Sequence, residues 1–313
     1  MGSLVFLLTK FMLHYRIIFL VILGYFVPAL AFAQSQDRLI FVGKTGLRFE
    51  KKDWSIAGNL EGTNPNIKSE LKWTELVIAD FSIASRFKFT PKFSVEAAGS
   101  FGKTISGMVS DIDYLGDNRT NPSYQLQIKN KKGSDQSFYG HLAYSFQPSP
   151  TFDIEPLIGY KVSSHNYWLS DDGIEQGGNT LNSSYKTNWK GPYAGVNIIF
   201  KPLERLAIQT NLQYHQINYR AEGNWNLMTQ FAHPKSFEHT AKGYQVSGSI
   251  SPIWTVHQNV KLLLDLGYHY GHTADGNDLA FMADGTQGYT RLNAVSRSYW
   301  QGRIGIIFNF LEI

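Results

Sequence analysis

The chain has 313 residues, of which 43% are hydrophobic, 14% aromatic and 17% charged, with no cysteine and a formal charge of +4. The lack of cysteine excludes a disulfide scaffold, a thiolate metal site and a cysteine nucleophile. The high aromatic share excludes intrinsic disorder. A helical membrane protein is also excluded, because only one apolar run reaches the roughly 20 residues of a transmembrane helix.

The N-terminus has the pattern of a secretory signal peptide. Lys10 and Arg16 precede an uncharged apolar run that ends Ala31-Phe32-Ala33 before a polar segment. A basic start, an apolar centre and an Ala-x-Ala ending predict cleavage after Ala33. An uncleaved anchor helix is the alternative. We therefore predict a signal peptide at 1–33 and one domain at 34–313, whose near-neutral charge gives no reason to expect nucleic acid as a partner.

Beyond residue 34 the hydrophobic pattern repeatedly has period two. Leu206, Ile208 and Leu212 share one parity, for example, while Gln209 and Gln213 share the other. This alternation indicates β-strands. In chain order the predicted strands are 37–50, 66–90, 93–111, 124–147, 151–168, 185–201, 205–225, 238–256, 259–272 and 288–310.

Strand length and turn pattern favour a membrane barrel over a soluble sandwich. Strands in globular proteins usually have about 5–6 residues, and several here exceed even the roughly 9–11 that span a membrane. Aromatic residues lie near the ends of the apolar parity, as in an interfacial girdle. Four short turns alternate with long polar loops, which are predicted near 51–65, 112–123, 168–185, 225–238 and 272–287. The predicted fold is all-β: a closed antiparallel transmembrane β-barrel of ten long strands in the outer membrane of a Gram-negative bacterium.

The interior of a ten-stranded barrel is narrow. We expect the inward-facing charged residues to pair across it as a structural network rather than to line a conduction path: Asp80, Arg86, Glu96, Glu155, Lys261, Asp265 and Arg303. Because the turns on one side are short, the surplus strand length is expected to project on the other, extracellular side. Pro156, inside the predicted fifth strand, removes one ladder donor.

Four segments, in this order, resemble the omptin family of outer-membrane proteases. Ser69-Glu70-Leu71-Lys72-Trp73 resembles the entry to the family's second strand, and residues 107–114 resemble its Met-Val-Asp-x-Asp-Trp segment with one insertion. Residues 185–195 resemble its Tyr-Lys-x-x-Phe-x-x-Pro-Tyr-x-Gly segment. Residues 305–310 resemble its C-terminal Gly-x-x-Tyr-x-Phe, although Leu311-Glu312-Ile313 follow here. The resemblance covers most of the chain beyond the signal peptide and implies an omptin-like barrel.

The resemblance implies a catalytic site that this sequence keeps only in part. Omptins are understood to activate water between an Asp pair and an opposite Asp-His pair, with the histidine as general base. Asp111 and Asp113 match the first pair, whereas Asn224 and Asn226 stand where the second Asp and the His are expected. An amide accepts no proton near neutral pH, and a general base is typically worth roughly 10²- to 10⁴-fold in rate. The sequence therefore predicts a degenerate protease site.

Two histidines near the altered pair keep an enzymatic alternative open. His233 or His239 can replace the missing base if the chain brings either into the cleft. Glu238 precedes His239, but neighbours in a strand point to opposite faces, so Glu238 cannot orient His239 directly.

The lipopolysaccharide site that omptins have on the barrel wall is altered too. The family's Tyr-x-Glu-x-Arg stretch corresponds here to Tyr160 through His165, which keeps Tyr160 but neither charge. A barrel with both sites altered resembles the omptin-related Protochlamydia-type outer membrane proteins, for which a porin-like role has been suggested. Outer-membrane lipid is the implied partner, with lipopolysaccharide as a weaker one, and the extracellular ligand stays unidentified.

No cofactor or metal is expected. The acidic stretch from Asp275 to Asp278 lacks the distal glutamate of a calcium loop, and His269 and His272 lie on opposite faces of a strand. The leading hypothesis is a non-enzymatic outer-membrane barrel that serves surface adhesion, binding or limited porin-like passage. The alternative is an omptin-type endopeptidase that uses Asp111, Asp113 and a displaced histidine.

Overall fold

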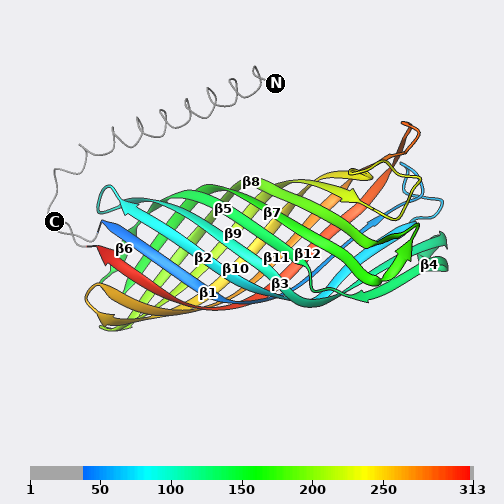
Figure 1. Cartoon of the computed structure of the whole chain (residues 1–313). Coiled ribbons are helices and arrows are strands. Elements are labelled where there is room, and N and C mark those ends of the chain that lie inside the picture. Colours follow the sequence, from blue (N-terminus) through cyan, green and yellow to red (C-terminus); the bar gives the residue numbers. More distant parts are fainter. Residues whose placement is uncertain (1–37, 311–313) are drawn as a thin grey trace, which may run out of the picture. The chain divides into compact units, whose positions relative to one another are not determined.

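The computed structural model describes residues 38–310, so the predicted signal peptide at 1–33 and its cleavage after Ala33 lie outside the described residues. The described residues form one antiparallel sheet (Figure 1). Its strands are β1 (Leu39–Ile56), β2 (Ser69–Lys88), β3 (Phe93–Gly116), β4 (Thr120–Lys129), β5 (Gly133–Tyr144), β6 (Phe146–Ser149), β7 (Phe152–Gln176), β8 (Asn179–Leu203), β9 (Leu206–Asn224), β10 (Phe237–His257), β11 (Val260–Phe281) and β12 (Gln287–Phe310). No helix within residues 38–310 is long and apolar enough to cross a membrane.

The sheet closes into a ring of ten positions. The strand β1 pairs with both β2 and β12, and β2 pairs with β3, which completes the circuit through β5, β7, β8, β9, β10 and β11. A closed ring satisfies every backbone group inside a bilayer without leaving an edge there. The predicted ten-stranded barrel is confirmed. The predicted fourth strand, 124–147, is divided among β4, β5 and β6.

Four of the five predicted long loops are wrong in their extent, and the first, 51–65, begins with six residues that continue β1. Residues 168–185 are mostly strand, because β7 and β8 stay paired until a turn at Gly177 and Gly178. Residues 272–281 likewise continue β11. Polar residues dominate these stretches, and apolar side chains such as Leu169 and Leu181 are buried. The apolar parity of a lipid-facing strand is therefore missing, yet the backbone ladder continues. The segment 112–123 is also a hairpin, closed by the one-turn 3₁₀ helix η2 (Asp117–Arg119).

The outer wall has an apolar band followed by a polar extension. Toward the long-loop end of the barrel, the apolar band ends at Phe49 on β1, Phe81 on β2 and Ile105 on β3, and all three side chains are exposed. Tyr268 and Trp300 pack together on the same wall with ring centroids 4.6 Å apart, as in an aromatic girdle. Beyond Phe49 the outward residues of β1 become polar, beginning with the exposed Lys51. We call the part of the barrel beyond this band the extracellular extension.

Charged pairs fill the barrel inside the apolar band, as expected from the inward parity. Arg303 lies 2.6 Å from Asp265 and 3.3 Å from Asp80. Arg86 lies 2.9 Å from Glu96 and 3.1 Å from Glu155. The predicted ion-pair network is therefore confirmed for six of its seven members, with Lys261 outside the pairs just described.

The network is larger than the sequence indicated. Arg48 bridges Asp80, Asp135 and Glu50, and Arg297 lies 2.7 Å from Glu50. Tyr167 donates a hydrogen bond of 2.6 Å to Glu50. All of these side chains are buried. Charges held this way are costly to expose singly, so the network ties β1, β2, β5 and β12 together inside the barrel.

Pro156 is accommodated by a break in the neighbouring strand. It pairs in register with Val196 of β8 on one side. On the other side the β5 ladder ends at Leu157 and the β6 ladder resumes at Ile154. The missing N–H of Pro156 therefore falls opposite the junction between β5 and β6.

Candidate functional site

The two aspartates of the omptin-like motif lie on the inner wall of the extracellular extension. Asp111 is opposite Leu71 of β2 and Leu126 of β4, and Asp113 follows two residues later on the same face of β3. Asp111 is buried and Asp113 is half-buried. The period of two along β3 thus places both carboxyl groups side by side, facing the interior.

The pKa of Asp111 is raised to about 7, chiefly by burial and also by the neighbouring Asp113 carboxylate, while a hydrogen bond from the Trp225 indole acts in the opposite direction. Burial also raises the pKa of Asp113, opposed by a hydrogen bond from Ser69 and by the positive charge of Lys68. Desolvation disfavours a charged carboxylate, and two adjacent carboxylates disfavour double ionisation. The pair therefore retains a proton up to nearly neutral pH.

The side chain of Asn226 connects the loop at 225–236 to the tip of β8 by hydrogen bonds. Its side-chain oxygen accepts hydrogen bonds from the Asn182 N–H at 2.8 Å and from the Ser183 hydroxyl at 3.1 Å. Its amide nitrogen donates to the Thr180 carbonyl at 2.8 Å. All these bonds use the amide's ability to donate and accept at once.

Asn224 has a separate contact. Its side-chain oxygen lies 2.9 Å from Nδ1 of His233, which is exposed in the loop. His233 is thus hydrogen-bonded to Asn224, the residue that stands where the resemblance places an aspartate. This contact lies at the surface of the extension and not in its buried interior.

A set of aromatic rings separates the aspartates from the opposite wall. The Trp225 ring packs 4.7 Å from Phe237 and 6.5 Å from Trp54, centroid to centroid, while its indole bonds to Asp111. Trp54 and Phe237 in turn lie 4.8 Å and 5.0 Å from the His239 ring. We call Trp54, Trp225 and Phe237 the aromatic plug. These three residues come from β1, the loop at 225–236 and β10, and they belong to one buried cluster.

His239 is fully buried behind this plug and has an acidic partner. Its Nε2 lies 3.1 Å from Asp278 of β11, and its Nδ1 lies 2.7 Å from the Tyr185 hydroxyl. Tyr185 in turn lies 2.7 Å from the hydroxyl of Tyr219. Asp278 was missed from sequence because it lies within a stretch that looked like a polar turn. It is the residue directly opposite His239 in the β10–β11 register.

Glu238 points to the outer face, as its position beside His239 predicted. It forms ion pairs with Arg220 at 2.8 Å and with Lys235. The expectation that Glu238 does not orient His239 is therefore confirmed.

The remaining candidates stand apart from this region. His269 stacks on Tyr299 at 4.3 Å inside the barrel, whereas His272 bonds to Ser296 at 3.0 Å on the outer face. Within residues 38–310 no group of three or more His, Asp or Glu side chains is placed to hold a metal ion. Tyr160 is exposed on the outer wall of β7.

Comparisons with known proteins agree with this architecture. A family model described as Pom, Protochlamydia outer membrane protein, matches residues 43–308. The crystal structure of the outer membrane protease OmpT from Escherichia coli is similar, with a TM-score of 0.66 and 16% identity, covering 90% of this chain and 100% of that one. At that identity the similarity shows a shared fold.

A weaker structural similarity is found with the translocator domain of the autotransporter NalP from Neisseria meningitidis. Its TM-score is 0.40 at 9% identity, covering 95% of this chain and 98% of that chain. A search of curated proteins gives no significant match.

Proposed function

This chain belongs to the Protochlamydia outer membrane protein family, and we propose that it is a non-proteolytic outer-membrane β-barrel whose extracellular extension binds a ligand at the cell surface. The barrel and the outer-membrane location follow from the family and the fold. The lack of proteolysis and the binding role are the proposal.

The aromatic plug is the observation that carries this proposal. Water attack on a peptide bond needs space for a water molecule and the scissile carbonyl between the carboxylates and the base. Here Trp225 is bonded to Asp111, and Trp54 and Phe237 pack against His239. Packed aromatic side chains therefore connect Asp111 to His239, and this packing supports the proposal that no substrate enters between them.

Binding is favoured over passage of solutes because the lumen is occupied as well. Arg48, Arg303 and their acidic partners cross the interior of the band as a connected set of buried pairs. Barrels of this size have little room beyond their own side chains. The extension is then the part of the molecule with free surface, and loops and strand tips commonly carry function on a rigid scaffold.

An omptin-type endopeptidase is the second candidate, and two observations favour it. The pKa of Asp111 is raised to about 7 by burial, in the range of a working acid or base. Asp278 lies 3.1 Å from Nε2 of His239, so a carboxylate stands close to a buried imidazole, the residue type that most often acts as a general base.

Refolded protein offered a fluorogenic peptide with paired basic residues separates the two candidates. We expect no turnover above that of a heat-inactivated sample. Turnover that disappears in Asp111→Asn and in His239→Gln would establish the endopeptidase and overturn the proposal. Conductance in planar bilayers tests passage in the same preparation, and we expect no steady open-channel steps.

A further inference from the structure

The ring of strands is interrupted above β5, and two strand edges are left unpaired there. In the described structure β4 pairs with β3 alone, and the part of β7 beyond Tyr167 pairs with β8 alone. Figure 1 shows β4 at the end of the barrel opposite the start of β1 and the end of β12, beside the β7–β8 hairpin. We call the opening between β4 and residues 168–176 of β7 the edge gap.

The base of the edge gap is closed by Lys132. Its ammonium lies 3.5 Å from the centroid of the Trp168 ring and donates a hydrogen bond of 2.7 Å to the Asn182 side chain. The strand β4 is also fixed from the inside, because Ile128 and Leu126 pack in the buried cluster behind it. The edge of β4 is therefore held in place before any partner arrives.

The register identifies which backbone groups of β4 are free. The Asn130 N–H donates to the Gly107 carbonyl at 2.8 Å, so Asn130 faces β3 with its hydrogen-bonding groups. In an antiparallel pair such residues alternate with residues whose N–H and C=O point away. The outward set on β4 is Gln125, Gln127 and Lys129, and the alternation ends at Ser123, where the β3–β4 register shifts. Their side chains are exposed.

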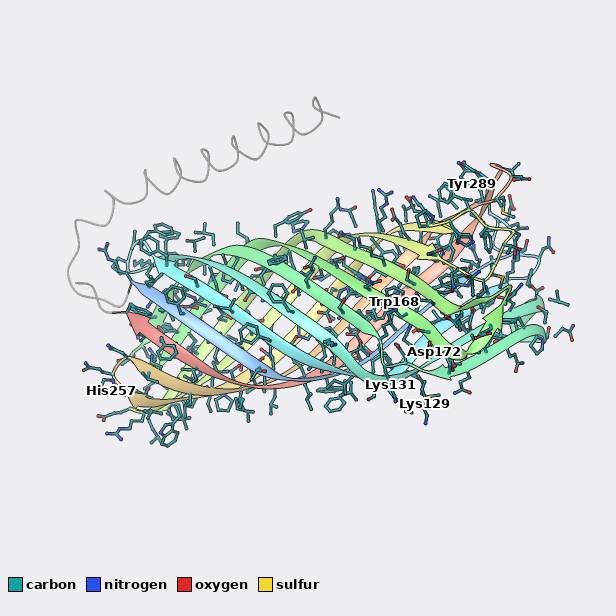
Figure 2. All side chains as sticks on the ribbon, in the orientation of Figure 1. Lys129, Lys131, Trp168, Asp172, His257 and Tyr289 are labelled. Carbon is teal, nitrogen blue, oxygen red and sulfur yellow. The ribbon has the colours of Figure 1, made fainter. Side chains whose placement is uncertain are left out.

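Charges of opposite sign flank the edge gap. Lys129 and Lys131 are exposed on the β4 side, and within residues 38–310 neither forms an ion pair. Asp172 and Glu175 are exposed near the tip of β7. Figure 2 labels Lys129 and Lys131, and on the other strand Trp168 and Asp172. The lysines lie toward the base of the gap, whereas the two acids lie toward its tip.

A second copy of the chain in the same membrane is a poor occupant. Two copies related by a two-fold axis along the membrane normal keep the same strand direction. Their β4 edges would then meet in parallel, which is the less stable pairing per residue. Antiparallel pairing of β4 with the β7 edge of the other copy would set base beside base, so Lys129 and Lys131 would not meet Asp172 and Glu175. An independent extended peptide has no such restriction.

We propose that the edge gap is a strand-addition site, in which an extended peptide of a partner protein pairs antiparallel with Gln125 through Lys129 of β4. Main-chain bonds to an exposed edge supply affinity in this mode of recognition, and side chains supply specificity. A peptide antiparallel to β4 has its N-terminal half beside Lys129 and Lys131 and its C-terminal half toward Asp172 and Glu175. Its N-terminal half is therefore acidic and its C-terminal half basic. This inference rests on the proposed binding function and names its partner chemistry.

The test uses refolded full-length barrel in detergent and a labelled peptide of about ten alternating threonine and valine residues, with two glutamates in its N-terminal half and two lysines in its C-terminal half. Fluorescence anisotropy measures binding, and hydrogen exchange measures protection of the β4 amides. We expect saturable binding and slowed exchange at Gln125, Gln127 and Lys129. A peptide with the two charged halves interchanged is expected to bind about tenfold more weakly at low salt.

Backbone substitutions separate strand addition from charge attraction. N-methylation of the peptide amides that face β4 removes its donors and leaves the protein unchanged, and we expect binding to weaken about tenfold or more. On the protein, Gln127→Pro removes one free N–H at an edge position that tolerates proline, and Gln127→Ala keeps that N–H as the matched control. We expect the proline variant alone to lose binding.

Three results would overturn the inference: no slowing of β4 exchange, equal binding of the N-methylated peptide, or a dimer in sedimentation that Gln127→Pro converts to monomer. The last result would assign the edge to a second copy. Mass spectrometry of the recovered peptide keeps the two proposals distinct. A cleaved peptide contradicts the non-proteolytic function, whereas an intact, unbound peptide contradicts strand addition only.

Discussion

The membrane-spanning part and the extracellular extension are closed by different chemistry. Inside the apolar band, arginines and carboxylates pair across the lumen, as Arg303 does with Asp265 at 2.6 Å. In the extension, the rings of Trp54, Trp225 and Phe237 fill the corresponding space. Ion pairs hold fixed partners at fixed distances, whereas aromatic packing depends on shape and area. In our proposal the first region resists passage of solutes and the second keeps a substrate away from Asp111.

The largest expected effect comes from leaving a charge of the lumen network unpaired. Glu50→Gln removes the acidic partner of the buried Arg297 and one of the three acidic partners of Arg48, and we expect it to lower the free energy of unfolding by about 3–5 kcal/mol. Glu222→Gln is the control, because its pair with Arg220 is exposed and such pairs contribute about 0–1 kcal/mol. Urea unfolding of both variants in lipid vesicles, followed by tryptophan fluorescence, measures the difference. Equal losses in the two variants would mean that the lumen pairs are solvated.

A smaller effect, with a distinctive pH dependence, is expected from Asp111 in the extension. Burial raises its folded-state pKa to about 7 from an ordinary 3.8, so the folded protein binds a proton that the unfolded chain has already lost between these values. This proton stabilises the fold fully below about pH 4, and the stabilisation is lost as the pH rises to about 7. Asp111→Asn, which carries no titrating group, is expected to be on the order of a few kcal/mol more stable than the parent at pH 8.

The measurement is the midpoint of urea unfolding at pH 4, 6 and 8 for the parent and for Asp111→Asn. Asp172→Asn, at an exposed position on the β7 side, is the control and is expected to follow the parent at every pH. If Asp111→Asn shows the same pH profile as the parent, then Asp111 is solvated and the plug is more open than its packing indicates.

The two regions also differ in how far sequence could predict them. The ten-stranded ring was predictable because each strand faces lipid on its outer side and polar or charged side chains on its inner side. This imposes a period of two on the sequence, as at Leu206, Ile208 and Leu212. The extension has water outside, so its outer face needs no apolar residues, and a mostly polar stretch such as 168–176 has the composition of a loop. The plug joins Trp54, Trp225 and Phe237 from three distant segments, and the pairing of His239 with Asp278 depends on the β10–β11 register. Neither the plug nor this pairing produces a pattern within a single segment of the sequence.

The smallest expected effect tests whether the altered residues or the plug prevents proteolysis. Asn224→Asp combined with Asn226→His restores the residue types that the omptin-like motif lacks. We expect no turnover of the paired-basic fluorogenic peptide, because Trp225 still occupies the space beside Asp111. The imidazole cannot replace all three hydrogen bonds of Asn226 to Thr180, Asn182 and Ser183, so faster hydrogen exchange is expected at residues 225–236. Turnover that appears in this double variant and vanishes on adding Asp111→Asn would show that the missing base alone, and not the aromatic plug, keeps the extension from acting as a protease.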